Sequence, residues 1–400
     1  MQKFGIVIGI PTISFVFLTI LSIIFPSLLF SIFGKFSSNL QPYEIGILGI
    51  PLLFSNILLL SLGILYYKNK LPPNIISAIN QIRIFEISKK HSTIILLIII
   101  SIYIGFSIPE LYIDESQQWP DYDILESALE IWPDGKSDNI FVEEQNDRYV
   151  RMFILDLSQN LFQNIKILPF IASILVILFT YLLTEQITHK RFPAIISTIL
   201  IIQSQTFLRF DTVAVYENFW VLFYLLSVYT IQKKWFLSPF FYILSFFTKA
   251  FVAPYFVLTL FFTSQSTISR KKKIAIFLSY MLIIGIALTI ILSSDTLYPS
   301  IIQIDVNKFF TGLSTFGPLL RYDLVLILSI LPVVVGLTIL SKNNLNHASS
   351  MLLLILGTLI SGPILVAFTN FYEILPYRYI PLIVFFSISI GLFFSKKLDS

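Results

Sequence analysis

Residues 165–183 read IKILPFIASILVILFTYLL, and this stretch decides the class of the protein because Lys166 is its only charged residue. A helix needs about 20 consecutive apolar residues to cross the roughly 30 Å hydrocarbon layer of a membrane. Similar runs recur along the 400-residue chain, in which 56% of residues are hydrophobic and 12% are charged. A soluble core cannot hide that much apolar surface. The sequence therefore predicts an all-α integral membrane protein with a single polytopic domain, 1–400.

Apolar runs bounded by charged residues place the individual spans. They lie at about 4–33, 44–67, 92–112, 164–186, 192–209, 212–232, 274–293, 322–340, 348–368 and 377–395. Residues 235–263 form a further apolar hairpin whose arms, at about 14 residues each, rise only roughly 21 Å. If the hairpin is counted, the prediction is about 11–12 transmembrane helices.

The basic residues between these spans set the orientation. Under this arrangement 17 of the 27 Lys and Arg residues fall on one side, together with both termini and only three acids. Cytoplasmic loops carry an excess of Lys and Arg, so this side is predicted to be cytoplasmic. The predicted location is the cell membrane, with a multi-pass chain and both termini in the cytoplasm.

The opposite side carries a long acidic loop, 109–163. Its segment 110–156 holds 13 of the 23 acidic residues and only three bases. Each Asp in hydrocarbon would cost roughly 2.5–3.5 kcal/mol, so the loop is predicted to be extracytoplasmic. Helical spacing of apolar residues at 124–131 and 150–161 predicts two short interfacial helices within it, and 72–90 resembles a cytoplasmic counterpart. A solvated loop that merely tolerates acids is the ordinary alternative.

Charged residues near the span ends on that same side suggest a site. The cations can hold a lipid phosphate, and a carboxylate can deprotonate an acceptor. The candidate cations are Arg209, Lys249, Arg321 and Arg378, and further candidates are Asp121, Asp211 and Tyr377. Lys249 lies at the tip of the short hairpin, where an ionisable residue is a functional candidate, with snorkelling to the interface as the alternative. An aromatic belt with a basic anchor is the ordinary explanation for Tyr377.

The order of motifs along the chain resembles the GT-C glycosyltransferases, and in particular protein O-mannosyltransferases and aminoarabinose transferases. The resemblance rests on DE at 114–115, YDILESALEIWPDG at 122–135, the amphipathic run that begins RYVRMF at 148, THKRFP at 188 and FFYILSFFTKAFVAPYF at 240–256. It implies a large external loop with the catalytic Asp and a polyprenyl-phosphate sugar donor. By position it implies Asp114 as the catalytic residue with Glu115 beside it, and Lys249 facing the donor phosphate.

The predicted function is therefore inverting transfer of a sugar from a polyprenyl-phosphate donor to an acceptor, which could be a protein, a lipid or a glycan. A lipid-linked oligosaccharide flippase or transporter is one alternative, and a non-catalytic membrane assembly subunit is another. Carboxylate oxygens suit Mg²⁺ or Mn²⁺, and the sequence leaves open whether a metal is bound. The absence of Cys excludes thiol chemistry, and the basic residues are too scattered for a nucleic-acid partner.

Overall fold

The chain folds into helices throughout the part described by the structure, a computed structural model that covers residues 2–28, 43–133, 135–146, 148–293, 305–343, 345, 347–368 and 375–395. These residues contain no β-strand. Six helices among them are long and apolar enough to cross a membrane: α1 (Gln2–Ile24), α3 (Gly49–Tyr67), α5 (Lys89–Ser107), α9 (Ile167–Thr188), α17 (Leu324–Lys342) and α18 (Ala348–Phe368). The prediction of an all-helical chain with several helices fit to span a membrane is confirmed.

Six further helices in the described part of the chain occupy the remaining predicted spans. They are α10 (Arg191–Ile202), α12 (Phe219–Lys233), α13 (Leu237–Thr248), α14 (Tyr255–Gln265), α15 (Arg270–Ser293) and α19 (Ile380–Leu392), the last preceded by η4 (Pro376–Tyr379). Helices α13 and α14 are joined by Lys249 and the single turn η2 (Ala250–Val252). With 12 and 11 residues, they rise only about 18 Å and 17 Å. Each predicted span thus contains a helix, while the number of crossings stays a prediction.

Three predicted spans differ from the observed helices, and residues 29–33 of the predicted span 4–33 lie outside the described residues. Helix α1 ends at Ile24, because Pro26 disfavours helical geometry in the residue before it. The predicted span 192–209 breaks after Ile202, and α11 (Gln205–Arg209) starts anew with the Ser204 hydroxyl accepting the Phe207 amide at 3.0 Å. The predicted span 212–232 becomes helical only at Phe219. Between α11 and α12, backbone groups form hydrogen bonds with side chains of the acidic loop.

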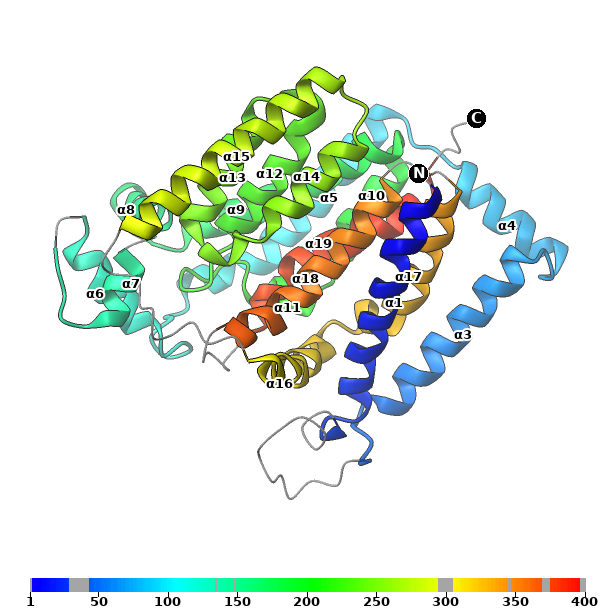
Figure 1. Cartoon of the computed structure of the whole chain (residues 1–400), viewed down its shortest axis with the longest axis horizontal. Coiled ribbons are helices and arrows are strands. Elements are labelled where there is room, and N and C mark those ends of the chain that lie inside the picture. Colours follow the sequence, from blue (N-terminus) through cyan, green and yellow to red (C-terminus); the bar gives the residue numbers. More distant parts are fainter. Residues whose placement is uncertain are drawn as a thin grey trace.

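The acidic loop lies at one end of the bundle. Its helices are η1 (Ile108–Tyr112), α6 (Tyr122–Ile131), α7 (Ile140–Asn146) and α8 (Tyr149–Phe162), and Figure 1 shows α6, α7 and α8 together at that end. Both helices predicted within the loop are present. Helix α4 (Pro73–Ile84), which buries none of its residues, lies at the opposite end.

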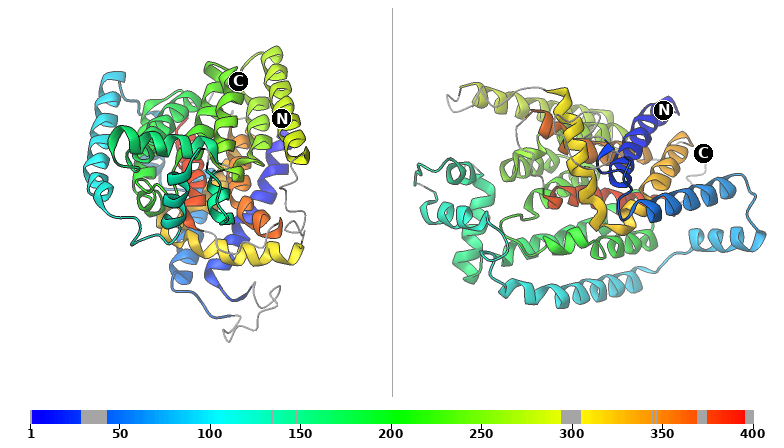
Figure 2. Two further views of the ribbon diagram at one scale, coloured as in Figure 1. Left: turned by 90° about the vertical axis from the view of Figure 1, so that its left-hand side faces the viewer. Right: turned by 90° about the horizontal axis from the view of Figure 1, so that it is seen from below.

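Helix α16 (Val306–Phe316) was not predicted from the sequence. It is followed by η3 (Gly317–Tyr322), and α16 lies across the axes of the neighbouring helices (Figure 2). The Gly312 backbone of α16 packs against Pro363 and Val366, near the end of α18. Its position beside the ends of α1 and α18 places it at the same end of the bundle as the acidic loop.

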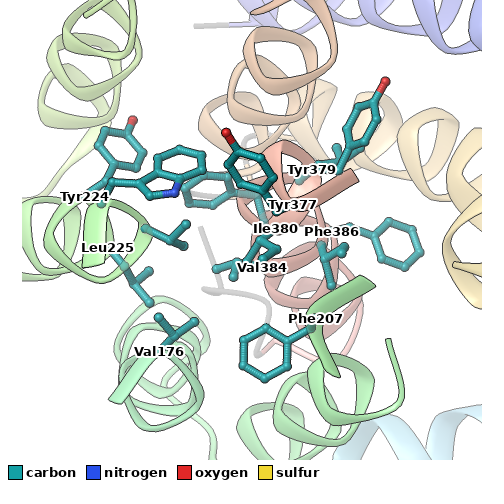
Figure 3. Packing of buried hydrophobic residues seen from close by; sticks show 14 of the residues in the cluster. Val176, Phe207, Tyr224, Leu225, Tyr377, Tyr379, Ile380, Val384 and Phe386 are labelled. Carbon is teal, nitrogen blue, oxygen red and sulfur yellow. The ribbon is translucent and has the colours of Figure 1, made fainter. Parts of the chain in front are cut away.

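Helix α19 forms the centre of the core. All its residues from Ile380 to Ser389 are buried, and it packs against α9, α10, α17 and α18. Figure 3 shows its residues Ile380, Val384 and Phe386 close to Phe207 of α11 and to side chains of α9 and α12. Tyr377 lies in η4, the short turn that leads directly into this buried helix.

Contacts between helix ends define the other end of the bundle. Gly5 near the start of α1 lies against Ser341 near the end of α17, and Gly336 lies against Phe393 just after α19. Arg83, Lys190 and Ser395 line one cavity at this end. The beginning of α1 and the end of α19 therefore share one end, away from the acidic loop.

Candidate functional site

The segment 210–218, between α11 and α12, is completely buried although it is not helical. Glu115 accepts hydrogen bonds from the amides of Ala214 at 2.7 Å and Val215 at 3.2 Å. Arg151 of α8 donates to the carbonyls of Val215 at 2.9 Å and Ala214 at 3.4 Å. Buried backbone groups must be paired, especially where no water is near. Two charged side chains of the acidic loop therefore pair the backbone groups of Ala214 and Val215, which form no helical hydrogen bonds.

Arg151 also forms a buried ion pair. Its Nε donates to Glu217 Oε2 at 3.0 Å, and the two side chains are only 2% and 1% exposed. Its Nη1 donates to Gln145 of α7. The guanidinium thus ties α7 and α8 to the segment that leads into α12.

Lys249 and Arg378 both lie against Tyr377, and the Arg378 Nε donates to the Tyr377 hydroxyl at 3.4 Å. The Lys249 Nζ atom is 4.0 Å from the centroid of the Tyr377 ring, and the Arg378 guanidinium carbon is 5.8 Å from it. Tyr216 stacks on Tyr377 with 4.9 Å between ring centroids, and its hydroxyl donates to Asp121 at 2.7 Å. The structure therefore brings together residues from four separate parts of the chain: Asp121, Tyr216, Lys249 and the adjacent pair Tyr377 and Arg378. Of these five residues, only Tyr216 was not a predicted site residue.

This cluster carries more positive than negative charge. Lys249 is 8% exposed, and no carboxylate of the described residues lies within ion-pair distance of it or of Arg378. The Arg378 Nη1 atom is buried and has no hydrogen-bond partner among the same residues. Glu217, whose charge acts on Lys249, is already paired with Arg151. Buried charge without a counter-ion is costly, so the arrangement suits an anionic ligand.

A polar cavity of about 380 Å³ lies beside the acidic loop. It is lined by Glu110, Ile113, Gln118, Trp119, Lys166, Arg209, Thr212 and Val213. The Arg209 guanidinium lies over Trp119 at 5.4 Å, whereas Lys166 donates to the carbonyls of Glu110 and Ile113. Arg209 forms no ion pair with a described residue, so this cavity too can receive an anion or a polyhydroxylated group.

The adjacent acids Asp114 and Glu115 have different surroundings. Asp114 is exposed, and its Oδ1 accepts the Ser116 amide at 3.0 Å. It directly follows Ile113, which lines the polar cavity. Glu115 is 2% exposed, and burial raises its pKa even though both oxygens accept backbone amides. Glu115 therefore positions the backbone, while Asp114 is accessible to a substrate.

Asp211 is buried within the irregular segment. Ser107 at the end of α5 donates to its Oδ2 at 2.7 Å. Burial raises the pKa of Asp211 to about 7, although hydrogen bonding to Ser107 opposes this change. Asp211 therefore links α5 to the segment and titrates near neutral pH.

Arg321 lines a different and larger cavity, which also includes Ser204 and Asp323. The Arg321 Nη2 atom donates to its neighbour Tyr322 at 3.0 Å. Of the predicted phosphate-binding cations, Lys249 and Arg378 therefore share one cluster, while Arg209 and Arg321 line two separate cavities. No group of three or more His, Asp and Glu residues suited to a metal occurs in the part of the chain described above.

The sequence interpretation missed Arg151 as a site residue. Its signal was present, since Arg151 lies on the buried face of α8 with Met152, Leu155 and Ser158. A charged residue on the apolar face of an amphipathic helix requires a buried partner. The sequence did not show which acid would supply it.

Comparisons with family models, with curated proteins and with solved structures gave no match to this chain. The fold and the six long apolar helices define a multi-helical protein with the features of a multi-pass membrane protein. The assignment of an activity depends on the chemistry of the site.

Proposed function

We propose that this chain is a membrane glycosyltransferase of the GT-C type that transfers a sugar from a polyprenyl-phosphate donor, with inversion at the anomeric carbon. The observation that supports it most is the buried cationic cluster of Lys249 and Arg378, which lacks a carboxylate partner among the described residues. A phosphate monoester or diester is the anion that such Lys and Arg donors bind well.

The proposed reaction is a single displacement. The Asp114 carboxylate takes the proton of the acceptor hydroxyl as the acceptor oxygen bonds to the anomeric carbon. The bond from that carbon to the phosphate oxygen breaks, and its electron pair leaves with the phosphate. Lys249 and Arg378 stabilise the departing charge. The configuration inverts because the acceptor oxygen enters opposite the leaving group.

The proposed topology places this site on the extracytoplasmic face, with about 11–12 crossings, the loop 109–163 outside and both termini in the cytoplasm of a cell-membrane protein. Its support is the distribution of basic residues and the position of the acidic loop at the end of the bundle away from Arg83 and Lys190. In this topology the Lys249 hairpin approaches the site from the membrane, where the isoprenoid chain of a donor lies.

The experiment measures binding of farnesyl phosphate to the purified protein in detergent, with farnesol as the uncharged probe. Lys249→Met should weaken binding of farnesyl phosphate by about 10- to 100-fold, because a charge-assisted hydrogen bond contributes roughly 1.5–3 kcal/mol. Lys234→Met, at an exposed position after α12, is the matched control and should bind normally. Equal affinity of farnesol and farnesyl phosphate, or normal binding by Lys249→Met, would contradict the proposed phosphate site.

A further inference from the structure

A cavity of about 750 Å³ lies between the end of α1, α10, α17 and α19. Ile23, Leu200, Leu326, Ile383 and Phe386 contribute to its mainly apolar wall. Ser387, also in the wall, is seven residues beyond the start of α19, which is about 10 Å along the helix axis. The cavity therefore extends from the end of the bundle well into the apolar region, and its volume is in the range of small-molecule sites.

The entrance of this cavity combines apolar and cationic groups. Ile47 is 98% exposed, Leu324 is 52% exposed and Val325 is 44% exposed, so apolar side chains surround the opening on the outside of the bundle. Arg321 is exposed beside them and forms no ion pair with any residue described here. An opening of this kind suits a molecule that has both a hydrocarbon chain and a negative charge.

The carboxylate at the entrance, Asp323, already accepts hydrogen bonds from within the protein. Asp323 is 4% exposed, and it accepts hydrogen bonds from the hydroxyls of Ser204 and Thr206. Its carboxylate thereby fixes the break between α10 and α11 against the start of α17. Asp323 is buried against these hydroxyls, whereas Arg321 is exposed, so the exposed charge among the residues that line the cavity is positive.

We propose that this cavity binds a membrane lipid with an anionic head group, and that this lipid is the acceptor of the transferred sugar. The acceptor role rests on the proposed glycosyltransferase function, whereas the lipid site stands on the cavity alone. The chain lies among Leu200, Leu326 and Phe386, and the head group lies against Arg321. The donor phosphate occupies a separate position, at Lys249 and Arg378.

Helix α11 connects the two positions. Gln205 at its start lines this cavity, and Arg209 at its end lines the polar cavity beside Asp114, about 6 Å farther along the helix axis. A head group at Arg321 can therefore extend a hydroxyl past Arg209 toward the polar cavity.

The test uses phosphatidylglycerol with a diazirine near the end of one acyl chain, photolysed with the purified protein in nanodiscs, and peptide mass spectrometry to locate the adducts. Phosphatidylcholine with the same chain is the neutral comparison. Phosphatidylglycerol should label 318–326 and 383–387 in preference to phosphatidylcholine, and Arg321→Gln should reduce that preference by about tenfold. Equal labelling by both lipids, or the same labelling in Arg321→Gln, would overturn the proposal.

Competition by unlabelled farnesyl phosphate separates the acceptor from the donor. If the two sites are distinct, farnesyl phosphate leaves the labelling unchanged in both the wild-type protein and Lys249→Met. Displacement of the photolipid with equal potency in both proteins would assign the cavity to the donor and overturn the acceptor role. Because these measurements record binding and not transfer, the lipid site can be confirmed even if the enzyme activity is refuted.

Discussion

Replacement of Arg151 by Met tests how the loop holds the site. The change preserves much of the length of the side chain but removes its bonds to Glu217, to Gln145 and to the carbonyls of the irregular segment. It leaves the Glu217 carboxylate buried without a counter-ion. Loss of one partner from a buried ion pair typically costs about 3–5 kcal/mol in the free energy of unfolding.

The neighbouring pair Arg148–Glu144 supplies a matched control. It is similarly close, at 2.7 Å, but its side chains are 26% and 54% exposed. Arg148→Met should therefore cost only about 0.2–1 kcal/mol. The double variant Arg151→Met/Glu217→Gln should be more stable than Arg151→Met alone, because it removes the uncompensated charge.

The assay is equilibrium unfolding in mixed detergent micelles, followed by circular dichroism, with all variants under the same conditions. The free energies of unfolding should rank Arg148→Met above the double variant and the double variant above Arg151→Met. If Arg151→Met is no less stable than Arg148→Met, the guanidinium does not hold the segment 210–218, and the account of the site geometry fails.

Two further predictions concern acids of the site. Asp114→Asn should reduce sugar transfer from a radiolabelled polyprenyl-phosphate sugar by roughly 10²- to 10⁴-fold while donor binding persists. The control Glu126→Gln should leave the transfer rate nearly unchanged. Normal transfer by Asp114→Asn would show that Asp114 is not the base. Because burial raises the pKa of Asp211 from 3.8 to about 7, the folded protein retains this proton more strongly than the unfolded chain. Stability should accordingly fall as the pH rises from about 4 to about 7, by roughly 4 kcal/mol, and then level off. Asp211→Asn should flatten this part of the unfolding curve against pH, and an unchanged slope would exclude Asp211 as its source.

The positions of the helices could be predicted from the sequence because apolar runs report burial in lipid or protein directly. The ends of the helices could not. The break at Ser204 depends on Asp323, more than 100 residues away, and the late start of α12 depends on Glu115 and Arg151. Such tertiary hydrogen bonds leave no periodic pattern in the chain.

From the sequence, the candidate site could be predicted only as a group of charged and aromatic residues near the span ends on the predicted extracytoplasmic side. That Lys249, Tyr377 and Arg378 meet was not encoded in their spacing, because η4 and the α13–α14 hairpin come from distant parts of the chain. The sequence also did not show that Asp114 is exposed while Glu115 is buried and fixed by two backbone amides. The difference arises from the fold of the segment that Glu115 contacts.

The most direct test of the central claim is an experimental structure of the protein in a nanodisc with bound polyprenyl phosphate. The quantity to measure is the distance from the phosphate oxygens to Lys249 Nζ and Arg378 Nη1. The account predicts that both nitrogen atoms lie within hydrogen-bonding distance, about 2.7–3.2 Å, of the phosphate. A phosphate bound elsewhere, with these two cations still free of it, would contradict the account.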